Sequence, residues 1–403
     1  MSRCEPLKSN KRAALAFLIS LLTWQSPRQA AADFVWDDNF QIHGFLTQGY
    51  VNTTSNSFFG DSEDGSFDFR ELGVNASYRF NPQLMASAQL LSRKAGDMYD
   101  GSLDVDYAQL DYTPYVSEQG RFGAILGRFK NPLGFYNDTR DVAATRPSIF
   151  LPQVIYWDRV RNMVLSNDGG MLHGDMHSGL HSVYQNLFTG KTPIDENVEN
   201  SYLPPITDPD MDQDGYTKGG RLLYEWDGGV FRLAFSGARL KLDGRMKQFP
   251  FPPPDGSVQT GTIDIDFWIA SAQYNRGPLS LTLEYMNEPL NFSGFSGFLD
   301  EQDTTLDGYY LQGNYRLSSD WEVLLRYEGA NFDKDNTETS DANTNQFVRM
   351  WTLGLLWEPI EKLMLRAEFS RVDGTIFLSN LENDPLNTER NWNMFALLAS
   401  YSF

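Results

Sequence analysis

Cysteine is almost absent from this chain of 403 residues, and its absence limits how the protein can be stabilised. The one cysteine, Cys4, lies before an apolar run from Ala13 to Trp24. Residues 1–32 have the order of a secretory signal peptide: basic residues, then this run of twelve residues, then a small-residue cleavage site. Without that peptide, residues 33–403 contain no cysteine, so no disulfide bond can stabilise the exported chain.

Long apolar runs are also lacking. A helix that crosses a bilayer needs roughly 20 apolar residues, and no stretch after residue 32 approaches this length. The N-terminal run is itself too short to serve as an anchor helix. The mean hydropathy of −0.42 is that of a soluble protein. These observations exclude a helical membrane protein. They leave a membrane β-barrel open, because alternating strands average to a modest hydropathy.

Basic residues and catalytic motifs are scarce as well. The chain has 33 Lys and Arg against 53 Asp and Glu, and residues 1–32 carry +4, so residues 33–403 carry a net charge near −24. No basic stripe or phosphate-binding loop occurs, so we expect no nucleic-acid partner. Four histidines and no G-x-S-x-G element leave no convincing nucleophile and base. The sequence therefore predicts that the protein is not an enzyme.

The C-terminal residues alternate between two faces, as in a β-strand with different surroundings on its two sides. The apolar face holds Phe395, Leu397, Ala399, Tyr401 and Phe403. The opposite face is smaller and more polar and ends with Ser400 and Ser402, which suits a wet lumen. This aromatic ending resembles the C-terminal assembly signal of bacterial outer-membrane proteins. The resemblance assigns that role to Phe403 and Tyr401.

The same alternation recurs along the chain, with short turns and longer polar connections between the segments. We expect strands at residues 40–52, 67–80, 83–93, 102–113, 121–130, 161–172, 179–189, 217–227, 230–240, 262–275, 278–287, 306–317, 320–331, 345–358, 361–372 and 390–403. Short turns at one end and long loops at the other are typical of bacterial outer-membrane barrels. The sequence therefore predicts an all-β fold, a transmembrane antiparallel β-barrel of sixteen strands.

Charged and aromatic residues agree with this fold. Arg366 and Glu368 lie in the middle of a strand, on the face opposite Leu365 and Ala367. A lipid-facing Arg or Lys would cost about 2–4 kcal/mol, so we expect the charged face to line a water-filled lumen. Aromatic residues gather at the short-turn ends and predict a girdle there: Tyr78, Phe80, Tyr112, Phe122, Trp226, Tyr274, Tyr315, Trp321, Trp357 and Phe403.

Two segments resemble the sixteen-stranded porins of Gram-negative outer membranes. Residues 126–134 look like the porin strand that leads into the constriction loop, and residues 161–174 look like the strand that re-enters the wall. The acidic Pro-Glu-Phe-Gly motif of the enterobacterial general porins is absent, so the chain is similar to a less characterised proteobacterial subgroup. The resemblance implies an inward-folded third long loop, a homotrimer in the outer-membrane lipid, and assembly by the barrel-assembly machinery.

The connection 131–160 is the predicted constriction. Its aromatic residues, such as Phe150 and Trp157, are unusual in a loop surrounded by water and indicate packing against the inner wall. From residue 128 to residue 161 the net charge is +3, in an otherwise negative chain. The candidate pore residues are Arg128, Lys130, Asp138, Arg140, Asp141, Arg146, Arg159 and Arg161. Two compatible roles are open: these groups anchor the loop, or they set ion selectivity.

Residues 210–215 match the first half of a calcium-binding loop, in which alternate carboxylates converge on the ion. Asp210, Asp212 and Asp214 are therefore candidate Ca²⁺ ligands in an external loop. The twelfth position of the motif is Arg221 rather than Glu, so the alternative is a turn rich in solvated aspartate. We expect no other cofactor.

Three functions are compatible with these features. The leading one is a porin, a water-filled channel for passive diffusion of small hydrophilic solutes and ions in the outer membrane of a Gram-negative bacterium. The first alternative is a substrate-specific channel for a sugar or an organic anion, with the aromatic residues of 131–160 as a stacking surface. The second is a surface receptor or adhesin that uses the acidic external loops.

We predict that the mature protein begins near Asp33, because the small residues before it form the cleavage site. N-terminal sequencing of protein purified from outer membranes measures this directly. A sequence that starts at Met1 would remove the argument for export.

Overall fold

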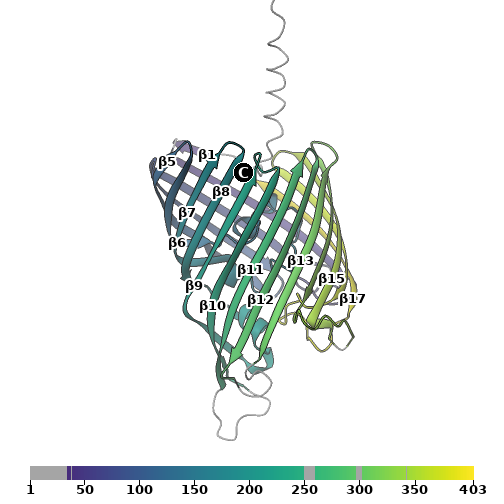
Figure 1. The fold of residues 1–403 in the computed structure, drawn as a ribbon. Coiled ribbons are helices and arrows are strands. Elements are labelled where there is room, and N and C mark those ends of the chain that lie inside the picture. The colour runs from purple at the N-terminus through teal and green to yellow at the C-terminus, as the bar shows by residue number, and fades with distance from the viewer. Residues whose placement is uncertain (1–33, 38, 249–258, 296–301, 342) are drawn as a thin grey trace, which may run out of the picture.

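Each long strand of the wall pairs with its neighbours in the chain, so the sheet closes without crossover connections (Figure 1). The computed structural model describes residues 34–37, 39–248, 259–295, 302–341 and 343–403. The signal peptide predicted at residues 1–32 lies outside the described residues. Among the described residues, no helix is long and apolar enough to cross a membrane.

The wall consists of a short strand, β1 (Phe34–Asp37), followed by sixteen long ones. The long strands are β2 (Phe40–Thr53), β3 (Ser66–Asn81), β4 (Leu84–Ala95), β5 (Tyr99–Ser117), β6 (Gly120–Lys130), β7 (Ser166–Ser178), β8 (His181–Lys191), β9 (Pro209–Trp226), β10 (Phe231–Met246), β11 (Gln259–Arg276), β12 (Leu279–Ser293), β13 (Asp303–Arg316), β14 (Trp321–Asn331), β15 (Phe347–Ile360), β16 (Leu363–Gly374) and β17 (Asn391–Ser402). The long connections contain α2 (Arg161–Leu165), α3 (Glu196–Tyr202) and the short 3-10 helices η1 (Asn137–Thr139), η2 (Ala143–Thr145), η3 (Pro205–Thr207) and η5 (Thr344–Gln346). In Figure 1 these connections lie mainly at the lower end, and the C-terminus lies at the upper, short-turn end.

The ring closes between β17 and β2. Their pairing runs up to Ser402 opposite Phe45, and the backbones of Phe403 and Gly44 then exchange two hydrogen bonds of 2.8 and 2.9 Å. The ring of Phe403 lies over Gly44, where a Cβ atom would come within 2.3 Å of it. Glycine at this position therefore makes room for the terminal aromatic ring.

The short strand β1 covers the part of β2 that β17 does not reach. Phe34 pairs with Ile42, and Asp37 pairs with Phe40, while the other edge of β2 is already occupied by β3. Backbone pairing therefore continues beyond Phe403, which matters because lipid offers no hydrogen bonds to an open strand edge. This strand was not predicted, since four residues are too few for alternation to be recognised.

The prediction of a sixteen-stranded antiparallel barrel is confirmed, but four predicted strands have bounds that are wrong by more than four residues. β10 ends at Met246 instead of residue 240, and β12 ends at Ser293 instead of residue 287. Residues 161–165 form α2, so β7 begins at Ser166 instead of residue 161. β9 begins at Pro209 instead of residue 217, because residues 209–214 pair with β10. Charged residues in that part of β9 hide the apolar alternation on which strand prediction depends.

The outward face of the wall is an apolar band. On β15, Leu353 is 60% exposed, whereas the preceding residue, Thr352, is 1% exposed and points inward. The predicted girdle at the short-turn end is confirmed: all its members are exposed except Tyr274, which is half-buried. An apolar band with an aromatic border is what a surrounding bilayer requires.

A second aromatic belt crosses the outer face nearer the long loops, and it was not predicted. Its members are Trp268, Tyr285, Tyr309, Tyr327 and Trp351 on β11 to β15. Three pairs of neighbours in it have ring centroids 4.8 to 6.2 Å apart. The next outward positions beyond it include Asp266, Asp307 and Arg349. The apolar band therefore ends at this belt.

The interior is not uniformly polar. Towards the long loops, inward residues of β10 to β12 such as Leu242, Ile263 and Leu290 are apolar and at most 2% exposed. The expectation that mid-strand charges face water is wrong for Arg366 and Glu368, which are 7% and 5% exposed. They are covered by the connection 131–160, which hydrogen-bonds to both.

We predict that Leu353→Arg strongly impairs folding into lipid, because it places a charge in the middle of the apolar band at a cost of about 2–4 kcal/mol. The matched control is Thr305→Arg, on the outward face of β13 beyond the second belt. Folding into lipid vesicles, followed by heat-modifiable mobility in electrophoresis, measures both. Equal folding of the two variants would contradict the position of the band.

Candidate functional site

The longest connection in the barrel joins β6 to β7 and contains residues 131–160, followed by α2. We call residues 131–160 the inner segment. Its backbone and side chains bond to the buried faces of strands around the whole ring. The strands involved are β3, β4, β9, β10, β11, β12, β13, β14 and β16.

Glu284 of β12 holds the beginning and the end of the inner segment together. Its carboxylate accepts hydrogen bonds from the Phe135 backbone N–H at 3.0 Å and from the Tyr156 hydroxyl at 2.6 Å. The Tyr310 hydroxyl of β13 donates a third at 2.7 Å. Glu284 is fully buried, and these donors replace the water that it loses.

Neighbouring strands hold the middle of the inner segment. Arg326 of β14 donates to the Ser148 hydroxyl at 2.7 Å and to the Phe150 carbonyl at 3.2 Å. Glu368 of β16 accepts from the Ile149 backbone N–H at 2.5 Å. A loop backbone without regular structure would leave these polar groups unpaired, so the wall charges serve as its hydrogen-bond partners.

On the other side of the ring, the inner segment enters a cluster of charges, the buried ion network. Its cations are Arg93, Lys130, Arg140, Arg146 and Arg161, and its carboxylates are Glu71, Asp106, Asp141 and Asp158. Within it, Arg146 contacts Glu71 at 2.7 Å and Arg93 contacts Asp158 at 2.9 Å. Burial lowers the pKa of Arg161 to about 10, and the nearby Arg93 and Arg140 act in the same direction.

Apolar contacts complete the packing of the inner segment. Phe150 lies 5.1 Å from Phe58 and 5.3 Å from both Phe59 and Phe69, measured between ring centroids. Phe58 and Phe59 belong to the connection between β2 and β3, so two long connections share one aromatic cluster. These buried side chains of the inner segment belong to the hydrophobic core.

The structure brings five of the eight candidate pore residues together. Lys130, Arg140, Asp141, Arg146 and Arg161 all belong to the buried ion network. Arg128 does not: it lies on the outward face of β6 and forms a double contact with Asp168 at 2.7 and 2.8 Å. Asp138 pairs separately with Arg221 of β9 at 2.9 Å. Arg159 lies apart from the network, over the ring of Trp157.

Sequence analysis missed the network's partners on the wall, Glu71, Arg93 and Asp106. The available signal was weak, because each is a single charge within a strand. They lie far from residues 131–160 in the sequence, and nothing in the sequence indicates that their side chains form ion pairs in the network.

The predicted convergence of Asp210, Asp212 and Asp214 is not found. They follow one another along β9, and each lies 3.8 to 3.9 Å from a different cation: Lys247 just after β10, and Arg245 and Lys241 on β10, respectively. An extended strand separates alternate carboxylates by nearly 7 Å. The part of the chain that the structure describes contains no group of three residues suited to a metal ion.

No protein-family model matches the chain, and no curated protein matches it by sequence. Solved structures do match. OmpT, an outer membrane protein of Vibrio cholerae, is 14% identical with a TM-score of 0.56, and the match covers 92% of this chain and 100% of that one. The outer membrane channel DcaP of Acinetobacter baumannii is 11% identical with a TM-score of 0.55 and the same coverage. An anion-selective porin from Comamonas acidovorans is 12% identical with a TM-score of 0.53, covering 90% and 99%. This chain therefore has the fold of the sixteen-stranded outer-membrane porins.

We predict that Glu71→Gln destabilises the barrel by about 3–5 kcal/mol, because it leaves two buried guanidinium groups without their shared carboxylate. The matched control is Asp212→Asn, whose ion pair with Arg245 is exposed and should contribute little. The unfolding temperature of each variant in detergent is the measurement. If the Glu71 variant unfolds at the same temperature as the control, the network does not hold the inner segment.

Proposed function

We propose that this protein is a porin of the outer membrane of a Gram-negative bacterium, through which small hydrophilic solutes and ions diffuse passively. The observation that supports this most is the closed ring of sixteen strands with an apolar band outside and polar side chains inside. A closed barrel of this kind satisfies all backbone groups in lipid. Its long connections carry the side chains that can act on a solute.

The inner segment is the proposed constriction. β4 and β12 lie half of the ring apart, and the segment bonds to both, through Arg93 to Asp158 and through Glu284 to Phe135. A chain that contacts opposite walls has to cross the lumen. We infer that solutes pass beside the inner segment, towards inward polar residues near the short turns such as Arg232 and Glu322, which are only partly buried.

Ion selectivity of this channel should be weak. The buried ion network contains five cations and four carboxylates, so most of the positive charge noted in the sequence is neutralised within it. Exposed carboxylates of the long loops, such as Asp341, are screened beyond about 8 Å at physiological salt. The small net positive charge that remains favours a channel with almost no ion selectivity or with a slight preference for anions.

The homotrimer, the assembly machinery and the absence of enzyme activity stay predictions from the sequence.

Planar-bilayer recording tests the proposed function. We expect open channels whose conductance rises with salt without saturation, and reversal potentials near zero under a salt gradient. Replacing Arg140 and Arg146 together by Ala should shift the preference towards cations, because it uncovers Glu71 and Asp158. The control is Arg239→Ala on the outer face. Strong cation selectivity at high salt that is unchanged in the double variant would contradict this account of ion selectivity. A barrel that conducts no ions would contradict the porin function itself.

A further inference from the structure

The connection between β16 and β17, residues 375–390, reaches across the long-loop mouth of the barrel. We call it the lid. In its middle, Asn380 Nδ2 donates a hydrogen bond of 2.8 Å to the backbone carbonyl of Asn200 in α3, which belongs to the connection between β8 and β9. These two connections lie half of the ring apart, with β9 to β16 between them on one side, and β17 and β2 to β8 on the other. The hydrogen bond therefore joins opposite sides of the mouth.

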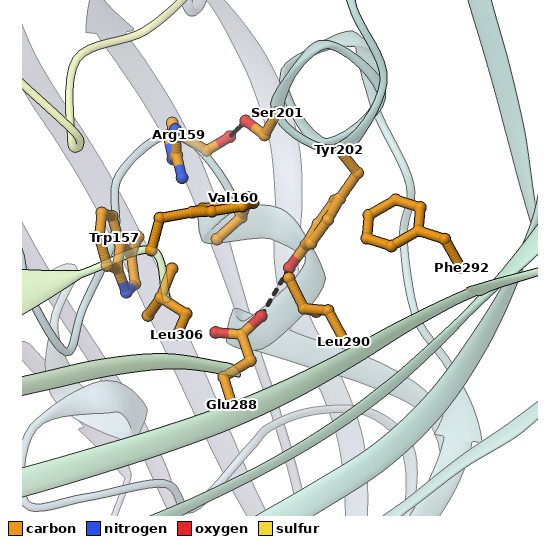
Figure 2. Close-up of a pocket in the computed structure, with 10 residues that line it drawn as sticks. Trp157, Arg159, Val160, Ser201, Tyr202, Glu288, Leu290, Phe292 and Leu306 are labelled. Atoms are coloured by element: carbon orange, nitrogen blue, oxygen red, sulfur yellow. Dashed lines mark hydrogen bonds between the residues drawn. The ribbon is translucent and has the colours of Figure 1, made fainter. Parts of the chain in front are cut away.

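α3 is fixed to the wall and to the inner segment. The Tyr202 hydroxyl donates to the Glu288 carboxylate of β12 at 2.9 Å, and the Ser201 hydroxyl donates to the Arg159 backbone carbonyl at 3.4 Å (Figure 2). Asn197 donates a further hydrogen bond of 2.7 Å to the connection between β4 and β5. α3 is thus the fixed side of the contact across the mouth.

Glu382 holds the lid in place two residues after Asn380. Its carboxylate accepts hydrogen bonds from the backbone N–H groups of Gly60 at 2.7 Å, Asp97 at 3.0 Å and Phe59 at 3.2 Å. These donors belong to the connections between β2 and β3 and between β4 and β5. Hydrogen bonds to a carboxylate are stronger than neutral ones, so this site is the main attachment of the lid to its neighbours.

The first part of the lid is buried in the mouth. Phe377 is 3% exposed, and its ring centroid lies 5.6 Å from that of Phe58, which in turn lies 5.1 Å from that of Phe150 in the inner segment. Val198 of α3 belongs to the same hydrophobic cluster and is 0% exposed. Side chains buried to this degree border no water-filled passage, and an apolar constriction excludes water and ions. The lid, α3 and the inner segment therefore close the part of the mouth that they occupy.

The rest of the lid is held more weakly than the inner segment. Among the described residues, one neutral hydrogen bond joins the lid to α3, whereas the inner segment enters the buried ion network. The tip of the lid is open to solvent, and Leu386 is 92% exposed. Segments with few buried contacts are the ones that open locally while the remaining structure stays folded. The lid meets this description.

We propose that the lid is a gate of the channel. With Asn380 on α3 and Glu382 on its three backbone donors, the lid closes the mouth, and this closed arrangement is the one in the structure. When these hydrogen bonds break, the lid moves towards β16 and β17 and opens the path to the inner segment. The gate is a second barrier, in series with the constriction. The inference rests on the proposed function, because a gate has an effect only in a barrel that conducts.

Shortening the lid tests the gate in single-channel recordings of the full chain. Replacing residues 379–386 by Gly-Gly removes both attachments, so we expect a higher mean conductance and fewer closures than in the unmodified protein. The matched control replaces residues 333–340, an equally long and largely exposed part of the connection between β14 and β15, by Gly-Gly. The same conductance and the same closures in the two shortened proteins would overturn the proposal.

Single substitutions test the two attachments separately. Asn380→Ala should raise the ratio of open to closed time by about two- to tenfold, the factor that corresponds to the loss of one neutral hydrogen bond. Glu382→Gln should raise it by about tenfold or more, because the lost hydrogen bonds involve a charge. Asn387→Ala is the control, since that side chain bonds only to Asp384 within the lid. If both test variants gate like the control, the proposal is wrong.

A reversible cross-link tests the closed state directly. Cys4 is the only cysteine of the chain, so Asn200→Cys with Asn380→Cys in a Cys4→Ser background introduces one defined pair. Oxidation of this pair should hold the channel closed or at its lower conductance, and a thiol reductant should reverse the effect. Each single-cysteine variant is a control and should not respond. A bridge that forms without changing the gating, or a pair that cannot be bridged in the folded protein, would overturn the proposal. This measurement decides if the shortened lid prevents folding.

The same recordings separate this inference from the proposed function. A barrel that conducts no ions with either the full or the shortened lid lacks the proposed function. A barrel that conducts equally with both lids is a porin without this gate. A barrel whose conductance rises when the lid is shortened, and falls when the cysteine pair is bridged, supports both.

Discussion

The whole structure depends on one requirement: in lipid, every backbone N–H and C=O group of the wall has to find its partner within the protein. A sheet meets this requirement only by closing on itself. Closure between β17 and β2 provides it here, and β1 extends the pairing beyond the last residue of β17. The strand tilt follows from that closure, and the apolar outer face follows from the contact with lipid.

Closure creates a second problem, because a ring of sixteen strands encloses more space than its own side chains fill. The inner segment and the connections near Phe58 occupy part of that space. Their backbones bring polar groups into the interior, and wall residues such as Glu284 and Arg326 supply the partners. Charged residues of the wall therefore hold the inner segment in place in addition to lining the lumen. Removing one of them would disturb the loop and the lumen together.

The sequence is sufficient to predict the fold, but it is not sufficient to predict the ion pairs in the interior of the barrel. Alternation is a local signal that repeats sixteen times, so the strands and their faces could be predicted. Asp210, Asp212 and Asp214 resemble a calcium-loop motif although they lie on a strand. Glu71 meets Arg146 only because β3 and the inner segment are brought together by the closed ring. Contacts between distant segments leave no periodic trace in the sequence.

The two aromatic belts have a consequence for the surrounding lipid. On β15, Trp357 marks one border of the apolar band and Trp351 the other, with Arg349 immediately beyond. A rigid wall cannot stretch, so the bilayer has to adjust its own thickness to the distance between these borders. Lipids next to the barrel therefore form a shell whose chain order differs from that of the bulk. Where the bilayer and the band differ in thickness, sharing such a shell favours the approach of neighbouring barrels.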